Sequence, residues 1–196
     1  RGVNTQKGLI FLLGVLTAAA AQTVRRCQRP APDVVLLAAA EMTKGVVARE
    51  LAPLQANPPQ RKLTAGERLY LTYGVTGIRG ELEAGLPAVR QGGLPALRAA
   101  LAQGLAVNDT LVQALLVIMT TVDDTTILHR HDMAALRFVR QEAQRALALG
   151  GMASEAGRTY VATLDKVFSA RRISPGGAAD LLAAAWFLHR LEESDF

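Results

Sequence analysis

Two adjacent carboxylates, Asp123 and Asp124, follow the apolar run 111–122 and are candidates to hold a divalent cation. Paired carboxylates repel each other, and a cation such as Mg²⁺ that bridges to substrate phosphates relieves this repulsion. Arg130 follows within two helical turns and could either bind phosphate or neutralise the pair. The pattern suggests an acidic metal site, and a solvated helix end is the alternative.

The segment 174–180 combines a helix start with two glycines and a carboxylate. Ser174 followed by proline predicts a capped helix N-terminus. Because Gly176 and Gly177 have no side chains, an anion could approach the free amides of the first turn. The same glycines could instead permit close packing, and both possibilities stay open. Asp180 lies among Ala and Leu residues, so we expect it to be buried beside a cation or a hydrogen-bond partner.

Two further segments place glycines beside polar side chains at expected helix ends. In 77–81, Arg79 lies between two glycines, which suits a phosphate-binding turn, and an exposed arginine in an ordinary turn is the alternative. In 2–8, Lys7 precedes a very apolar stretch, where it could also be a simple positive flank. Together with the segments 123–130 and 174–180, these two segments indicate phosphate and metal binding.

Residue types and spacing exclude other kinds of site. The single cysteine, Cys27, excludes an intramolecular disulfide and a Cys-based zinc site, and it fits a reducing cytoplasm, where we expect the protein to be located. His129, His131 and His189 lack the spacing of zinc ligands. The sequence has no phosphate-binding P-loop, no nucleophile elbow and no dinucleotide fingerprint.

The composition favours a helical globular protein. The hydrophobic fraction of 50% excludes overall disorder, and the net charge of +5 makes a polyanionic ligand plausible. Ala and Leu are abundant, and no alternation typical of a strand appears. We predict an all-α fold: a single catalytic domain over 1–196, with about eight helices and a very apolar central helix.

Caps, breakers and apolar periodicity set the expected helices. Thr64 and Glu67 form a capping box, and 132–149 carries a clear apolar stripe, whereas the glycines within 73–81 predict an irregular turn. The uncharged run 8–24 could be a signal or membrane segment, but we favour a buried core helix. The expected helices are 6–26, 34–51, one after Thr64, 92–103, 109–121 (capped by Asn108 or Asp109), 132–149, 154–170 and 175–193.

Taken in order, the four polar segments resemble the triphosphoribosyl-dephospho-coenzyme A synthase family. Residues 2–8 are similar to the family pattern Gly-x-Asn-Thr-His-Lys-Gly, with Gln6 in place of histidine. Thr-Ala-Gly-Glu, Gly-x-Arg-Gly-Glu, Asp-Asp-Thr-x-x-x-x-Arg and Ser-Pro-Gly-Gly-x-Ala-Asp-Leu-Leu are also similar to family segments. The resemblance spans essentially the whole chain. Because family members are longer at the N-terminus, we expect the chain to correspond to their C-terminal two-thirds.

The resemblance implies a transferase that moves the triphosphoribosyl group of ATP onto 3′-dephospho-coenzyme A and releases adenine. The product is the prosthetic-group precursor for the acyl carrier protein of citrate lyase or malonate decarboxylase. The implied partners are ATP, 3′-dephospho-coenzyme A and Mg²⁺, with a possible homodimer and with neither nucleic acid nor membrane. Such glycosyl transfer needs a base, a proton donor and cations that hold a triphosphate.

The resemblance also implies roles for residues, and segments far apart in the sequence should then meet in one pocket. Catalytic roles fall to Asp124, Asp180 and Glu81; phosphate or nucleotide binding falls to Asn4, Thr5, Lys7, Arg79, Arg130, Ser174, Gly176 and Gly177; Mg²⁺ binding falls to Asp123, Asp124 and Asp180.

Two alternatives belong to other classes. An all-α isoprenoid synthase would share the aspartate pair, but Ile127 stands where a third aspartate is needed. A basic helical nucleic-acid-binding or scaffold protein would gather its arginines on one face, whereas here they are scattered through most helices.

Overall fold

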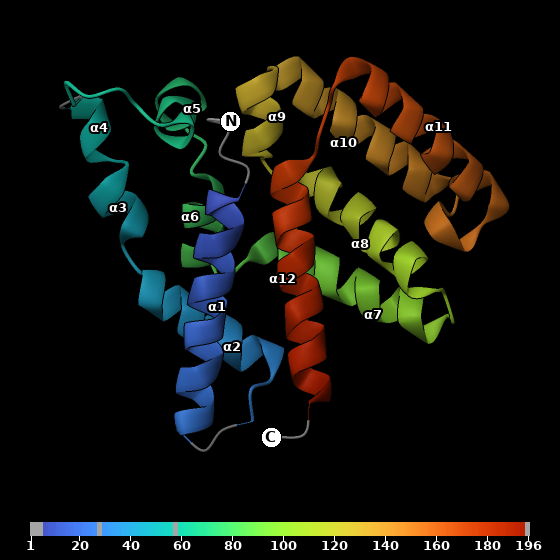
Figure 1. Ribbon diagram of the computed structural model, residues 1–196, viewed down its shortest axis with the longest axis horizontal. Helices are drawn as coiled ribbons and strands as arrows, with labels where there is room; N and C mark the ends of the chain where they lie inside the picture. The colour runs from blue at the N-terminus through green and yellow to red at the C-terminus, as the bar shows by residue number, and fades with distance from the viewer. Residues whose placement is uncertain (1–5, 27–28, 57–58, 195–196) are drawn as a thin grey trace. The chain divides into compact units, whose positions relative to one another are not determined.

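The computed structural model describes residues 6–26, 29–56 and 59–194, and every regular element in these ranges is helical (Figure 1). The all-α prediction is therefore confirmed. The helices are shorter and more numerous than the expected eight, because several predicted helices are broken. The chain divides into two compact units, 1–87 with 187–196 and 88–186, and the prediction of a single domain stays a prediction.

The first unit contains six helices within its described residues and also the last part, from residue 187, of α12 (Gly176–Glu193). These are α1 (Lys7–Arg25), α2 (Pro32–Thr43), α3 (Val46–Glu50), α4 (Pro53–Ala56), α5 (Ala65–Tyr73) and α6 (Gly77–Glu83). Helices α1, α2 and α6 pack on one another, and α6 also packs on α3. This unit therefore holds the segments around Lys7, Arg79 and Glu81.

The expected buried apolar helix at the start of the chain is not confirmed. Leu12, Leu16 and Ala19 of α1 are fully buried on one face, at helical spacing. On the rest of the helix Ile10 is 67% exposed, and only 28% of the most apolar window is buried. By length and composition alone α1 could cross a membrane, a property that core helices of soluble proteins and signal sequences share.

A long-range contact breaks the helix expected over 34–51. The backbone turns at Gly45, whose φ of +74° is readily available to glycine. The carboxylate of Glu83 accepts hydrogen bonds from the amides of Gly45 and Val47, at 2.8 and 3.0 Å. Both hydrogen bonds lower the pKa of Glu83, and the bond from Val47 has the larger effect. The start of α3 is thus capped by a side chain from α6.

The irregular turn expected over 73–81 is only partly present, and this expectation was wrong for 77–81. Gly74 ends α5 with a φ of +71°, and the chain then turns into α6 at Gly77, whose φ is +58°. Arg79 and Gly80 lie inside α6, so Arg79 extends from a helix rather than from a flexible loop.

The second unit is built around α8 (Val107–Thr121), which packs against η1, α7, α10 and η2. Ala114 and Ile118 of α8 are fully buried within this unit. The very apolar central helix predicted for the chain is not confirmed. The other elements are the π-helix η1 (Ala88–Gly93), α7 (Leu94–Ala102), α9 (Thr125–Arg130), α10 (Met133–Ala148), the 3₁₀-helix η2 (Gly151–Ala153), α11 (Glu155–Arg171) and α12 (Gly176–Glu193).

The predicted helix starts at 132 and 154 agree with the structure within one residue, and the predicted Thr64 capping box is present. Asp132 and Ser154 accept hydrogen bonds from the first turns of α10 and α11, although these two caps were not predicted. The expected cap at Asn108 or Asp109 was wrong, because α8 begins after Ala106 without a side-chain cap. Helix α9 was not predicted, since its six residues are too few to show an apolar period.

Candidate active site

Asp124 is the buried centre of the acidic site in the second unit. It is 1% exposed and is the N-cap residue of α9. Its Oδ1 atom accepts hydrogen bonds from the amides of Thr126 and Ile127, at 2.8 and 3.2 Å. Its Oδ2 atom accepts one from the amide of Ala178 in the first turn of α12, at 2.9 Å. One carboxylate therefore satisfies free amides at the N-termini of two helices, where negative charge is favoured.

The two glycines of α12 allow this close approach. A Cβ atom at Gly177 would lie 3.0 Å from Cγ of Asp124, and one at Gly176 would lie 2.7 Å from Oγ1 of Thr126. Of the two possibilities left open by the sequence, the geometry supports packing. The anion beside the first turn of α12 is the protein's own Asp124. Phosphate binding by Ser174, Gly176 and Gly177 stays a prediction.

Asp180 is the second carboxyl of the site and differs from Asp124 in its surroundings. It lies one turn inside α12, where it is half-buried, and its carboxyl has no hydrogen-bond partner among the residues that the structure describes. Burial, and next the negative charge of Asp124, raise the pKa of Asp180 to about 6. Asp180 thus titrates close to neutrality, as an acid–base group should.

Asp123 does not join this pair. Its side chain is 53% exposed and forms an ion pair with Arg140 of α10, with Nη2 2.7 Å from Oδ1. The same Nη2 atom donates to the carbonyls of Thr121 and Val122 at the end of α8, at 2.8 and 2.9 Å. Arg140 therefore holds Asp123 on the outside of the turn, whereas Asp124 points inward.

The predicted Mg²⁺ ligands, Asp123, Asp124 and Asp180, consequently do not form one cluster. Asp123 is bound to Arg140, and three of the lone-pair directions of Asp124 are taken by amides. No group of three or more metal-ligating side chains occurs in the part of the chain that the structure describes. The residues present do not fit a resident Mg²⁺ ion held by these three aspartates.

Arg130 lies in the same unit as the acidic pair. It is exposed at the C-terminal end of α9, whereas Asp124 caps the N-terminal end. Six residues of helix separate them by about 9 Å along the axis. The expectation that Arg130 and Asp124 serve one site stays a prediction.

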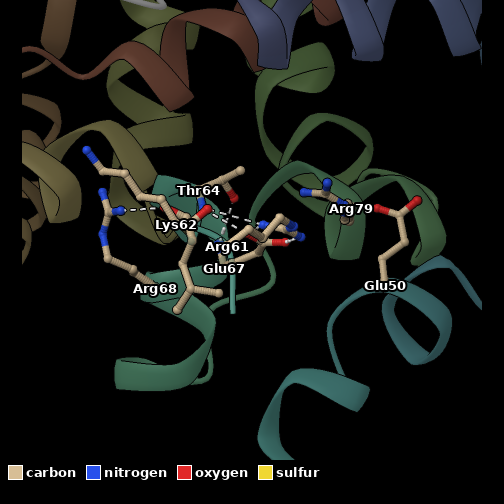
Figure 2. A network of polar contacts seen from close by, with 8 residues as sticks. Glu50, Arg61, Lys62, Thr64, Glu67, Arg68 and Arg79 are labelled. Carbon is tan, nitrogen blue, oxygen red and sulfur yellow. Dashed lines mark hydrogen bonds and ion pairs between the residues drawn. The ribbon is translucent and has the colours of Figure 1, made fainter. Parts of the chain in front are cut away.

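The polar residues of the first unit form a different kind of network (Figure 2). Arg61 makes a two-pronged contact with Glu67, with nitrogen–oxygen distances of 2.6 and 2.9 Å. The bonds from Arg61, and next the amide of Thr64, lower the pKa of Glu67 to about 2. Arg79 pairs through Nε with Glu50 at 2.6 Å. In Figure 2 its terminal nitrogens are directed away from Glu50.

The other predicted site residues have fewer described contacts. Lys7 is exposed as the first residue of α1, and Glu81 is half-buried in α6. Asn4 and Thr5 lie outside the described residues. The meeting of Arg79 with Asp124 and Gly176 in one pocket stays a prediction.

Sequence reasoning missed two functional contacts of the site. The first is the N-cap role of Asp124, although aspartate before two threonines is a usual helix start. The second is Arg140, which lies 17 residues from Asp123 and separates the two aspartates. Nothing in the local sequence distinguishes Arg140 from the other arginines of α10.

The family comparison assigns the protein to the transferases. Residues 1–195 match the family described as ATP:dephospho-CoA triphosphoribosyl transferase (CitG), and the chain belongs to this family. Its function is that of a triphosphoribosyl-dephospho-CoA synthase, with ATP and dephospho-CoA as substrates. Neither the isoprenoid synthase nor the basic binding protein is supported. A search of the solved structures found no match.

Proposed function

We propose that Asp180 is the general base of the triphosphoribosyl transfer and that Asp124 positions and tunes it. In this reaction a ribose hydroxyl of 3′-dephospho-coenzyme A attacks C1′ of the ATP ribose. A carbon–oxygen bond forms, the bond from C1′ to adenine breaks, and adenine leaves with the electron pair. The hydroxyl proton passes to Asp180, and adenine takes up a proton from solvent water as it leaves.

The observation that carries this proposal is the surroundings of the Asp180 carboxyl. It has a pKa of about 6 and no hydrogen-bond partner among the described residues. Above pH 6 the ionised form dominates, so the base is present at neutral pH. Because its pKa is higher than that of an ordinary aspartate, the carboxylate binds the hydroxyl proton more tightly.

Asp124 contributes through its fixed charge. Three backbone amides hold its carboxylate in place, so its orientation does not depend on the substrate. Its charge helps to raise the pKa of Asp180. The same negative charge would stabilise the positive charge that develops at C1′ in the transition state.

The remaining predicted residues complete the proposal. Arg79, Arg130 and Lys7 supply positive charge for the triphosphate, and Glu81 is a second candidate base. Mg²⁺ enters as a companion of ATP, bound by the phosphate oxygens, rather than as a resident ion. We also propose that the cytoplasmic enzyme acts as a homodimer and that its product serves an acyl carrier protein. Light scattering of the purified protein tests the dimer.

Substitution of Asp180 by Asn tests the central assignment. The variant removes the base while keeping size and polarity, so we expect adenine release to slow by roughly 10²–10⁴-fold. The helical circular dichroism should not change. Asp165, an exposed aspartate of α11 in the same unit, provides the matched control Asp165→Asn, which should keep wild-type activity.

The pH profile gives a second test of the same residue. Wild-type kcat/KM should fall about tenfold per pH unit below pH 6, because the base of the free enzyme becomes protonated. The residual activity of Asp180→Asn should lack this acidic limb. Full activity in Asp180→Asn, or an unchanged acidic limb, would overturn the role of Asp180.

A further inference from the structure

The linker between α11 and α12 runs along α9 from one end to the other. At the C-terminal end of α9, Nε2 of His131 donates to the carbonyl of Arg172 over 3.0 Å. At the N-terminal end, Gly176 packs against Thr126. The linker therefore brings Arg172 to the end of α9 that carries Arg130, and brings α12 to the end that carries Asp124.

Three arginines lie next to this contact in the chain. Arg130 precedes His131 and Arg171 precedes Arg172, so the bond from His131 to the carbonyl of Arg172 brings the backbone of all three to one end of α9, and all three are exposed. The guanidinium of Arg171 lies over the ring of Phe138, 4.1 Å from the ring centre, in a cation–π contact that does not use its hydrogen-bond donors. The neighbouring acid, Asp132, accepts the amide of Ala135 as the cap of α10. The segments 129–132 and 171–174 that meet here thus carry three arginines and one acid, and the carboxylate of that acid caps a helix.

The backbone at Arg172 is strained. Arg172 ends α11 with a φ of +55°, in the left-handed region that glycine usually occupies at this position. Its amide bonds to the carbonyls of Phe168 and Ser169, so the helix end itself needs only the backbone conformation. Glycine would meet that need with less strain, and an exposed arginine there points to a use for its side chain.

We propose that Arg172, with Arg130 and Arg171, binds the polyphosphate chain of a substrate whose reacting ribose lies toward Asp180. The length of α9, about 9 Å, separates the arginines from the acidic pair along the helix axis. Guanidinium groups bind phosphate oxygens in two-pronged contacts, and three of them suit a polyphosphate. Both ATP and dephospho-CoA carry such a chain. This assignment rests on the proposed role of Asp180.

Substitution of Arg172 by Gly separates a binding role from a structural one. Because glycine relieves the strain, we expect the variant to melt about 2–4 °C higher than the wild type. Loss of one charge-assisted contact should raise the KM of the substrate bound there by about 10- to 100-fold, with kcat little changed. Arg172→Lys should recover part of the loss.

Arg145→Ala is the matched control, because Arg145 lies in the last turn of α10, far along that helix from Asp132. It should leave both KM values unchanged. If the KM for ATP rises in Arg172→Gly, the group binds the triphosphate; if the KM for dephospho-CoA rises, it binds the diphosphate of that substrate. Unchanged KM values for both substrates would overturn the proposal.

Inorganic triphosphate, used as a competitive inhibitor, tests phosphate binding by the arginines without depending on the proposed role of Asp180. It should inhibit the wild type, and Arg172→Gly should weaken this inhibition about as much as it raises KM. Equal inhibition of the wild type and Arg172→Gly would overturn the arginine site. Direct binding of triphosphate to Asp180→Asn should stay at the wild-type level, while turnover is lost. The pH profile of Arg172→Gly should keep its acidic limb near pH 6. A failure of the arginine proposal can therefore be distinguished from a failure of the proposed role of Asp180.

Discussion

Glu67 in the first unit and Asp180 in the second are both carboxyls inside helical structure, yet their pKa values shift in opposite directions. The pKa of Glu67 is lowered to about 2, because Arg61 and the amide of Thr64 bind the charged form. The pKa of Asp180 is raised to about 6, because burial and Asp124 disfavour the charged form. The difference lies in which form of each carboxyl its surroundings favour: the partners of Glu67 bind the charged form, whereas burial, and to a smaller extent Asp124, disfavour the charge of Asp180.

This contrast separates a carboxyl that stabilises the fold from one that is available for chemistry. Glu67 uses its oxygens to cap α5 and to bind Arg61. Asp180 keeps its oxygens for a ligand, at the cost of an unfavourable charge in the folded state. Substitutions should therefore affect stability in opposite directions at the two positions.

The largest effect on stability should come from substitution of Asp124, a residue that both stabilises the fold and belongs to the candidate site. Asp124→Asn turns one acceptor oxygen into an NH₂ group, which cannot accept the amide of Ala178 or those of α9. We expect the free energy of unfolding to fall by about 2–3 kcal/mol, measured in urea. The matched variant Asp123→Asn alters an exposed ion pair and should cost at most about 1 kcal/mol. Equal losses in the two variants would contradict the buried role of Asp124.

A smaller loss is expected for Glu67→Gln. The variant weakens the capping box and the contact with Arg61, which should cost about 1 kcal/mol at pH 7 without changing kcat. Because the folded pKa of Glu67 lies below the unfolded value, its contribution is complete above about pH 4.5 and is lost as the pH falls toward 2. Urea unfolding of both proteins across this range measures the effect. A difference that persists at pH 2 would show that the charge of Glu67 is not its source.

The smallest effect on stability is expected for Asp180→Asn, which should make the protein more stable rather than less. Because the folded pKa of Asp180 lies above the unfolded value of 3.8, the folded state binds more protons between pH 4 and 6, and ionisation destabilises it as the pH rises. Asp180→Asn should therefore be more stable at pH 7, by about 1 kcal/mol after allowance for solvent screening. The gain should vanish below pH 4 in thermal melts. A loss of stability at pH 7 would contradict the unfavourable charge.

Local features of the fold could be predicted from the sequence. The capping residues Thr64, Asp132 and Ser154 start helices because their side chains bind amides two or three residues away. The buried stripe of α10 through Leu136, Val139 and Ala143 follows from apolar spacing alone. Both kinds of signal are complete within one or a few turns of the chain.

Features that depend on distant residues could not be predicted. Glu83 accepts the amide of Gly45 from 38 positions away, and nothing near Gly45 in the sequence indicates that partner. The same holds for the candidate site. The sequence indicated Asp124 and Asp180, but the bond from Ala178 to Asp124 spans 54 positions. The outward turn of Asp123 depends on Arg140, so the three aspartates were grouped wrongly as one cluster.

Helix α9 has a consequence for the heat sensitivity of the enzyme. A helix of six residues is far below the length at which an isolated helix is stable in water, so α9 depends on its cap and on its neighbours. If α9 opens locally, the amides that orient Asp124 are released, and the acidic pair loses its geometry while the other helices stay folded. Catalysis should then be lost on heating before the helical signal of the whole protein declines.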